Sequence, residues 1–129
     1  MSLDTDQVEP KALRFVATSR EDLRSFPQDV RQVIGFALYL AQTGDKHARA
    51  KPLKGYRGAG VLEVVEDFAG DTFRAVYTVR FRDAVYVLHA FQKKSKTGIK
   101  TPKRELDLID ERLKQAERHY QQMQKEPGR

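Results

Sequence analysis

The stretch FRAVYTVRFRDAVYVLHAF, residues 73–91, decides the fold. It contains two runs rich in β-branched and aromatic residues, Phe73 to Phe81 and Val85 to Phe91, and this composition is typical of β-strands. The break at Arg82-Asp83 is far shorter than the crossover of about a dozen residues that parallel strands require. The two runs are therefore expected to form an antiparallel hairpin.

More elements flank the hairpin. A third strand, Val61 to Phe68, is joined to it by Ala69 to Thr72, and Ala12 to Ala17 has the content of a short N-terminal strand. Ser19 is a candidate cap for a short helical turn. The closely spaced strands are expected to form a small antiparallel sheet.

Helices are expected before and after the strands. Pro27 suits the first turn of a helix that ends at Gly44, and Thr101 can cap a helix that begins at Pro102. Each has an apolar stripe at helical spacing: Val30, Val33, Ile34, Ala37, Leu38 and Ala41 in the first, and Leu106, Ile109, Leu113, Ala116 and Tyr120 in the second. The sequence therefore predicts an α+β fold, with the sheet packed against N-terminal helices and a C-terminal helix.

Composition suits one compact domain. The chain has 129 residues, of which 40% are hydrophobic. We expect a flexible lead-in over residues 1–10, a single domain over 11–120 and a loose tail over 121–129. The absence of cysteine excludes disulfides and thiolate metal sites. Because no signal peptide or long apolar run is visible, we expect a cytoplasmic protein with no membrane partner.

The charge indicates an anionic partner. Lys and Arg number 24 against 18 Asp and Glu, which gives a formal charge of +6. The apolar strand that ends at Phe91 carries His89 and is followed by Lys93, Lys94 and Lys96. A proton carrier beside fixed positive charges has what is needed to handle a phosphodiester, and this combination points toward RNA.

The register of the hairpin predicts which side chains share a face. If a two-residue turn pairs Phe81 with Ala84, His89 lies opposite Val76 and diagonal to Arg74. One face then carries Arg74, Val76, Thr78, Arg80, Val85, Val87, His89 and Phe91. The other face carries Phe73, Ala75, Tyr77, Val79, Phe81, Tyr86, Leu88 and Ala90, and it is the more uniformly apolar of the two. We therefore expect the second face to pack on helices and the arginines and histidine to face outward.

Several of these segments resemble one known family. The runs 73–77, 85–94 and Thr101-Pro102, with Arg14-Phe15-Val16, residues 19–23 and Phe26-Pro27, are similar to the HigB-like, phage-derived branch of the RelE/ParE toxin superfamily. The resemblance covers about residues 11 to 120. It implies a toxin of a type II toxin–antitoxin pair that cleaves mRNA on the translating ribosome without a metal or other cofactor. It also implies a cognate antitoxin, commonly a helix-turn-helix protein.

The chemistry of RNA cleavage assigns roles to candidate residues. A base must take the proton of the 2′-hydroxyl, an acid must protonate the departing 5′-oxygen, and cations must hold the negative charge that develops on the phosphorus. The catalytic candidates are Arg74 for charge stabilisation, His89 for proton transfer, and Lys93 and Lys94 for either role. The candidates for RNA binding are Lys51, Lys54, Arg80 and Lys96. His47 and His119 lack metal-ligand spacing, so no metal site is expected.

One departure from the family keeps alternatives open. The family often has an arginine two places after the strand glutamate, but Val65 follows Glu63 here. The chain could instead be a gyrase-directed toxin of the same fold, or a noncatalytic module that binds a helix-turn-helix partner. His89 could equally be an ordinary histidine packed against the terminal helix, and Arg74 and Arg80 could be polar residues on an exposed sheet face.

Overall fold

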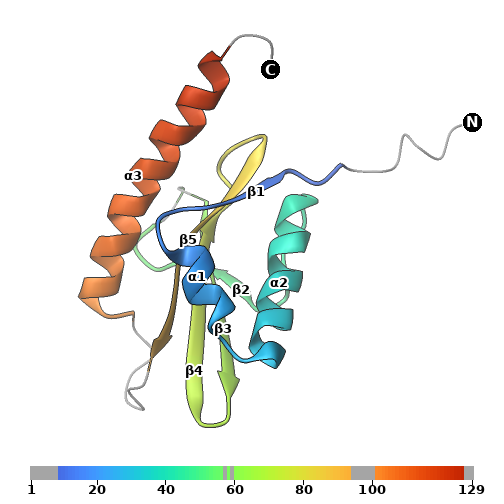
Figure 1. Ribbon diagram of the computed structural model, residues 1–129, viewed down its shortest axis with the longest axis vertical. Coiled ribbons are helices and arrows are strands. Elements are labelled where there is room, and N and C mark those ends of the chain that lie inside the picture. The colour runs from blue at the N-terminus through green and yellow to red at the C-terminus, as the bar shows by residue number, and fades with distance from the viewer. Residues whose placement is uncertain (1–8, 57, 59, 94–100, 127–129) are drawn as a thin grey trace, which may run out of the picture.

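The computed structural model describes residues 9–56, 58, 60–93 and 101–126, and it confirms the α+β class (Figure 1). The elements are β1 (Ala12–Phe15), α1 (Ser19–Arg24), α2 (Gln28–Gln42), β2 (Ala50–Pro52), β3 (Val61–Phe68), β4 (Asp71–Thr78), β5 (Ala84–Lys93) and α3 (Lys103–Lys125). Helix α3 continues past Tyr120, so the expected domain boundary at residue 120 lies inside the helix. No helix in the described part of the chain is both long enough and apolar enough to cross a membrane.

The five strands form one sheet in the order β1-β5-β4-β3-β2. Neighbouring strands from β2 to β5 are antiparallel, as expected for short connections. The expectation of a wholly antiparallel sheet is wrong for β1, which lies parallel to β5. The connection from β1 to β5 contains both N-terminal helices and three strands, which is ample for a parallel pairing.

Helices cover both faces of the sheet. Figure 1 shows α2 on one side of the strands and α3 on the other, and Leu23 of α1 packs against the same core as α2. One core lies under α2 and includes Ile34, Tyr77 and Val87, and a second core lies under α3 and includes Leu88 and Ile109. Strand β5 is central to both cores, and every residue from Ala84 to Phe91 is buried. This explains why that run is continuously apolar instead of alternating.

The β4–β5 hairpin has the expected register from Thr72 to Val76, and from Tyr77 onward the pairing is shifted by one residue. His89 lies opposite Val76, as predicted, but Tyr77 lies opposite Val87, so Leu88 is an extra residue in β5 and forms a β-bulge. The predicted two-residue turn is wrong, because β4 ends at Thr78 and β5 begins only at Ala84.

The bulge changes which side chains of β5 share a face. Val85 and Val87 pack in the core under α2, whereas Tyr86, Leu88 and Phe91 pack in the core under α3. The sequence-based assignment of these residues to faces is therefore wrong for Val85, Val87, Tyr86 and Leu88. A bulge lets two successive residues of one strand lie against a single residue of its neighbour, which shifts the alternation by one.

Tyr77 provides a test of core packing. Its ring is fully buried, its hydroxyl has no hydrogen-bond partner among the described residues, and burial raises its pKa to about 12. We expect Tyr77→Phe to raise the free energy of unfolding by about 1 kcal/mol in urea titrations at pH 7, because a buried unsatisfied hydroxyl is removed.

The same variant has an expected pH dependence. A raised pKa in the folded state contributes stability that is complete below pH 10 and is lost as the pH rises towards about 12. The alkaline loss of stability should therefore be smaller in Tyr77→Phe than in the wild type. Tyr39→Phe is the matched control, because Tyr39 is 53% exposed and should change neither property. A less stable Tyr77→Phe would contradict the prediction.

Candidate functional site

Three of the predicted site residues lie on one face of the sheet. Lys51 pairs with Glu63, Glu63 with Val76, and Val76 with His89, which forms a row across four strands. The neighbouring row places Arg74 between Val65 and Phe91. Directly paired residues share a face, so Lys51, Arg74 and His89 lie on the same side of the sheet as α3.

The expectation that this face is open to solvent is wrong for Arg74 and His89. Each residue is only 5% exposed. The reason is α3, which packs Ile109 and Ala116 against the second core and covers the sheet from that side. His89 instead packs against the terminal helix, which is the alternative that the sequence left open.

Arg74 forms a buried ion pair with a carboxylate of the neighbouring strand. Its Nη1 donates to Glu63 Oε2 over 2.8 Å, and Thr101 Oγ1 donates to the same oxygen over 3.1 Å. The Arg74 side chain is 6% exposed and that of Glu63 is 15% exposed. Little water screens the pair, so its two charges depend strongly on each other.

His89 is held by one residue at each ring nitrogen. Its Nε2 lies 2.6 Å from Glu105 Oε1, and its Nδ1 lies 3.0 Å from Arg112 Nη1. A guanidinium can only donate, so Nδ1 must accept, and the ring proton of a neutral imidazole must therefore lie on Nε2, where it is donated to Glu105. The Phe91 ring stacks on the imidazole at a centroid distance of 4.8 Å. The orientation of the His89 ring is fixed.

Arg112 connects three parts of the fold. Besides contacting His89, its Nη1 donates to the carbonyl of Leu88 over 3.1 Å, and its Nη2 donates to Thr18 Oγ1 over 3.3 Å. Leu88 is the bulge residue, so Arg112 supplies a donor to a carbonyl at the point where the ladder is interrupted.

Sequence reasoning missed both Glu105 and Arg112. A usable signal was present, because each lies at the spacing of the apolar stripe: Glu105 is four residues before Ile109, and Arg112 is four residues before Ala116. Charged residues at core-facing helical positions require partners. That requirement points to a polar cluster under α3.

Two further cations line a groove beside this cluster. The groove has a volume of about 270 Å³ and is lined by Ala48, Arg49, Lys51, Glu63 and Val65. Lys51 is exposed, and so is Lys54, which follows β2. Arg49, which forms an ion pair with Glu66, lines the groove together with Val65.

Arg80 and Lys93 lie on other parts of the described chain than the cluster under α3. Arg80 lies beyond the end of β4 and forms an ion pair with Glu117 of α3 over 2.5 Å. Lys93 is half-buried at the end of β5, opposite Thr72. Lys94 and Lys96 lie outside the described residues.

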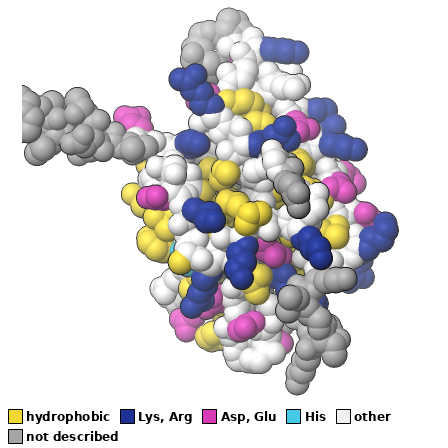
Figure 2. Space-filling model, turned by 180° about the vertical axis from the view of Figure 1, so that it is seen from behind, with side chains coloured by type: hydrophobic (Ala, Val, Ile, Leu, Met, Phe, Trp, Pro, Cys, Tyr) yellow, Lys and Arg dark blue, Asp and Glu magenta, His cyan; other side chains and the backbone are white. Residues whose placement is uncertain are grey.

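Basic side chains are dispersed on one side of the molecule. Figure 2, which views the molecule from behind Figure 1, shows Lys and Arg side chains spread over that side, with acidic and apolar side chains between them. Across the described residues, no group of three or more His, Asp and Glu side chains is placed to hold a metal ion. The clearest concentration of polar side chains at low exposure is the cluster formed by Glu63, Arg74, His89, Glu105 and Arg112.

Comparison with known proteins identifies one family. Residues 21–114 match the family model described as phage-derived protein Gp49-like. No curated protein sequence matches the chain. The match covers well over half of the chain and agrees with the phage-derived branch indicated by the sequence motifs.

Two solved structures are similar at low identity. One is the toxin RelE of E. coli in the free state, as a double arginine-to-alanine mutant, with 18% identity and a TM-score of 0.48, over 64% of this chain and 82% of that chain. The other is the toxin–antitoxin complex RelBE2 of Mycobacterium tuberculosis, with 22% identity and a TM-score of 0.42, over 69% of this chain and 98% of that chain.

The buried ion pair makes a stability prediction. Glu63→Gln should lower the free energy of unfolding by about 3 kcal/mol, because the Arg74 charge loses the carboxylate that it contacts in a poorly hydrated place. Glu117→Gln is the matched control, because its pair with Arg80 is partly exposed and should contribute about 1 kcal/mol or less. Urea unfolding of both variants checks the difference. Equal losses of unfolding free energy in the two variants would contradict the prediction that the buried ion pair contributes more than the partly exposed one.

Proposed function

We propose that this chain, which belongs to the family of Gp49-like phage-derived proteins, is the toxin of a toxin–antitoxin pair and stops translation by cutting mRNA on the ribosome. The observation that carries the proposal is the placing of Lys51, Arg74 and His89 on one face of the sheet. These residue types supply the cations and the proton carrier that a metal-independent cleavage of RNA requires. The formal charge of +6 favours association with RNA and ribosomes in the cytoplasm.

The reaction is an internal phosphoryl transfer. The ribose 2′-oxygen forms a bond to the adjacent phosphorus and loses its proton to a base, and the bond to the 5′-oxygen breaks as an acid gives that oxygen a proton. The products end in a 2′,3′-cyclic phosphate and a 5′-hydroxyl. Arg74 suits the phosphate oxygens through its planar donors, and His89 suits proton transfer, with Lys93 and Lys94 as further cations.

RNA must replace the present partners of these groups. Glu63 and Glu105 now accept from Arg74 and His89, and a phosphate oxygen can accept from the same donors. Substrate binding in this proposal is therefore coupled to separation of Glu105, in the first turn of α3, from β5. In this proposal the RNA outside the scissile position is contacted by Lys51, Lys54 and Arg49. Further candidates for RNA contact are Arg80 and Lys96.

One observation favours a second candidate function. Both principal catalytic candidates are buried and paired with carboxylates, which is the arrangement of structural ion pairs. Such a protein could act as a noncatalytic module that binds a helix-turn-helix partner. In that case loss of Arg74 or His89 would matter only through folding.

Induction in growing bacteria tests the proposal. Wild-type protein should arrest translation and leave transcripts with 2′,3′-cyclic phosphate ends. His89→Gln and Arg74→Lys should each lower the rate of cutting by about 100-fold or more, because a proton carrier or a bidentate donor set is lost. Mapping of transcript ends and labelled amino-acid incorporation give the two measurements.

The controls separate chemistry from folding. His47→Gln and Arg82→Lys change the same residue types away from the buried cluster and should leave cutting unchanged. Circular dichroism of each variant verifies that it is folded. DNA damage with intact transcripts would support a gyrase-directed toxin instead, and harmless expression of folded wild type would support the noncatalytic module.

A further inference from the structure

A second cleft lies under the C-terminal half of α3, and we propose that it binds a phosphate group. The cleft has a volume of about 460 Å³, within the range of small-molecule sites. Its lining comes from β1 and the residues after it, from β5 and from α3: Arg14, Phe15, Val16, Ala17, Tyr86, Gln115, Ala116 and His119. Its nearest lining residues on α3, Gln115 and Ala116, follow Arg112 of the His89 cluster by about one helical turn, and none of the five residues of that cluster lines it.

Arg14 supplies the positive charge of this cleft. Its Nη1 donates to Tyr86 Oη over 2.8 Å, and its guanidinium carbon lies 5.5 Å from the centre of the Tyr86 ring. Both contacts are to a neutral phenol, and no carboxylate in the described part of the chain lies within ion-pair distance of Arg14. A half-buried guanidinium without a counter-charge attracts an anion, and its planar fork suits two oxygens of a phosphate.

Two side chains of α3 add donors on the same side of the cleft. Gln115 and His119 are four residues apart and so lie above one another on the helix. The Tyr86 hydroxyl lies 2.7 Å from His119 Nδ1. When that hydroxyl donates to Nδ1, the imidazole proton is on Nε2 and remains available for a ligand.

Small residues keep the space open. Ala116 lies between Gln115 and His119 in sequence, and Ala17 forms the opposite side with a φ of 53°. This left-handed conformation is uncommon for a residue with a Cβ atom. The methyl groups leave room for a ligand that larger side chains would fill.

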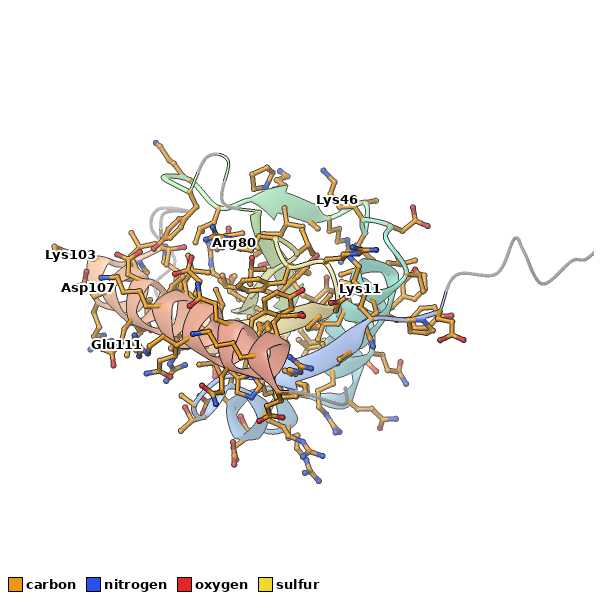
Figure 3. The ribbon with its side chains drawn as sticks, turned by 90° about the horizontal axis from the view of Figure 1, so that it is seen from above. Lys11, Lys46, Arg80, Lys103, Asp107 and Glu111 are labelled. Atoms are coloured by element: carbon orange, nitrogen blue, oxygen red, sulfur yellow. The ribbon has the colours of Figure 1, made fainter. Side chains whose placement is uncertain are left out.

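The charges on the outer side of α3 are different. Figure 3 shows Lys103, Asp107 and Glu111 along that outer side, and Lys103 Nζ lies 3.2 Å from Asp107. The cation there is already neutralised by its helical neighbour, whereas Arg14 has no such partner. A compact cleft with converging donors fits a phosphate better than the acidic helix of a protein partner, which needs an extended groove.

Titration of the full-length protein, followed by NMR of the Arg14 and His119 side chains, tests the proposal. The probes are inorganic phosphate, adenosine monophosphate and a short single-stranded RNA. At least one probe should saturate the wild type, and Arg14→Met should weaken its binding by about tenfold or more, because charge-assisted hydrogen bonds are lost. Arg118→Met, which removes an equal charge from an exposed position outside the cleft, should bind as the wild type does.

The probes also separate the sources of the phosphate. Binding of the free phosphates identifies a small-molecule site, and binding of RNA alone identifies a backbone contact. If Arg14→Met does not fold, Gln115→Leu takes its place and should weaken the same binding. The proposal is overturned if the probes bind the wild type and the folded cleft variants equally, or if none of the three probes binds the wild type. These outcomes do not depend on whether the protein cuts mRNA.

Discussion

The contact between Arg112 and the bulge of β5 is the constraint on which the arrangement under α3 depends. The extra residue Leu88 interrupts the ladder, and the Arg112 guanidinium donates to its carbonyl while also contacting His89 and Thr18. A buried guanidinium is stable only when its donors are used. The bulge, the position of α3 and the orientation of the imidazole are therefore determined together.

Helix α3 is attached to the sheet by an apolar stripe and by polar groups. Ile109, Arg112 and Ala116 are buried, and Leu106, Leu113 and Tyr120 pack against the second core while partly exposed. Hydrogen bonds and ion pairs continue on both sides of them, from Tyr56 to Asp110 near one end and from Tyr120 and Gln124 to Asp83 near the other. Burial and the Asp110 carboxylate raise the pKa of Tyr56, which keeps its hydroxyl protonated as a donor. The helix is held in one register by directional contacts.

The sequence was enough to predict most of the helices and strands, but not which of their side chains are buried. Composition and short connections were enough to predict the α+β class, the meander and the placing of His89 opposite Val76. The bulge could not be read from β5, because a strand covered on both faces has no alternation to interrupt. The prediction that Arg74 and His89 are exposed was wrong, because the covering of this face by α3 depends on tertiary packing. Glu105 and Arg112 were missed because the core-facing side of the helix was defined by its apolar residues alone.

The short strand β2 has a consequence for how this sheet can meet other chains. It forms one border of the sheet, is three residues long and ends in Pro52, which has no amide hydrogen to offer. Lys51 places a charge on the same border. These features discourage backbone pairing with a foreign strand and edge-to-edge aggregation. Recognition on that side must therefore rely on side chains.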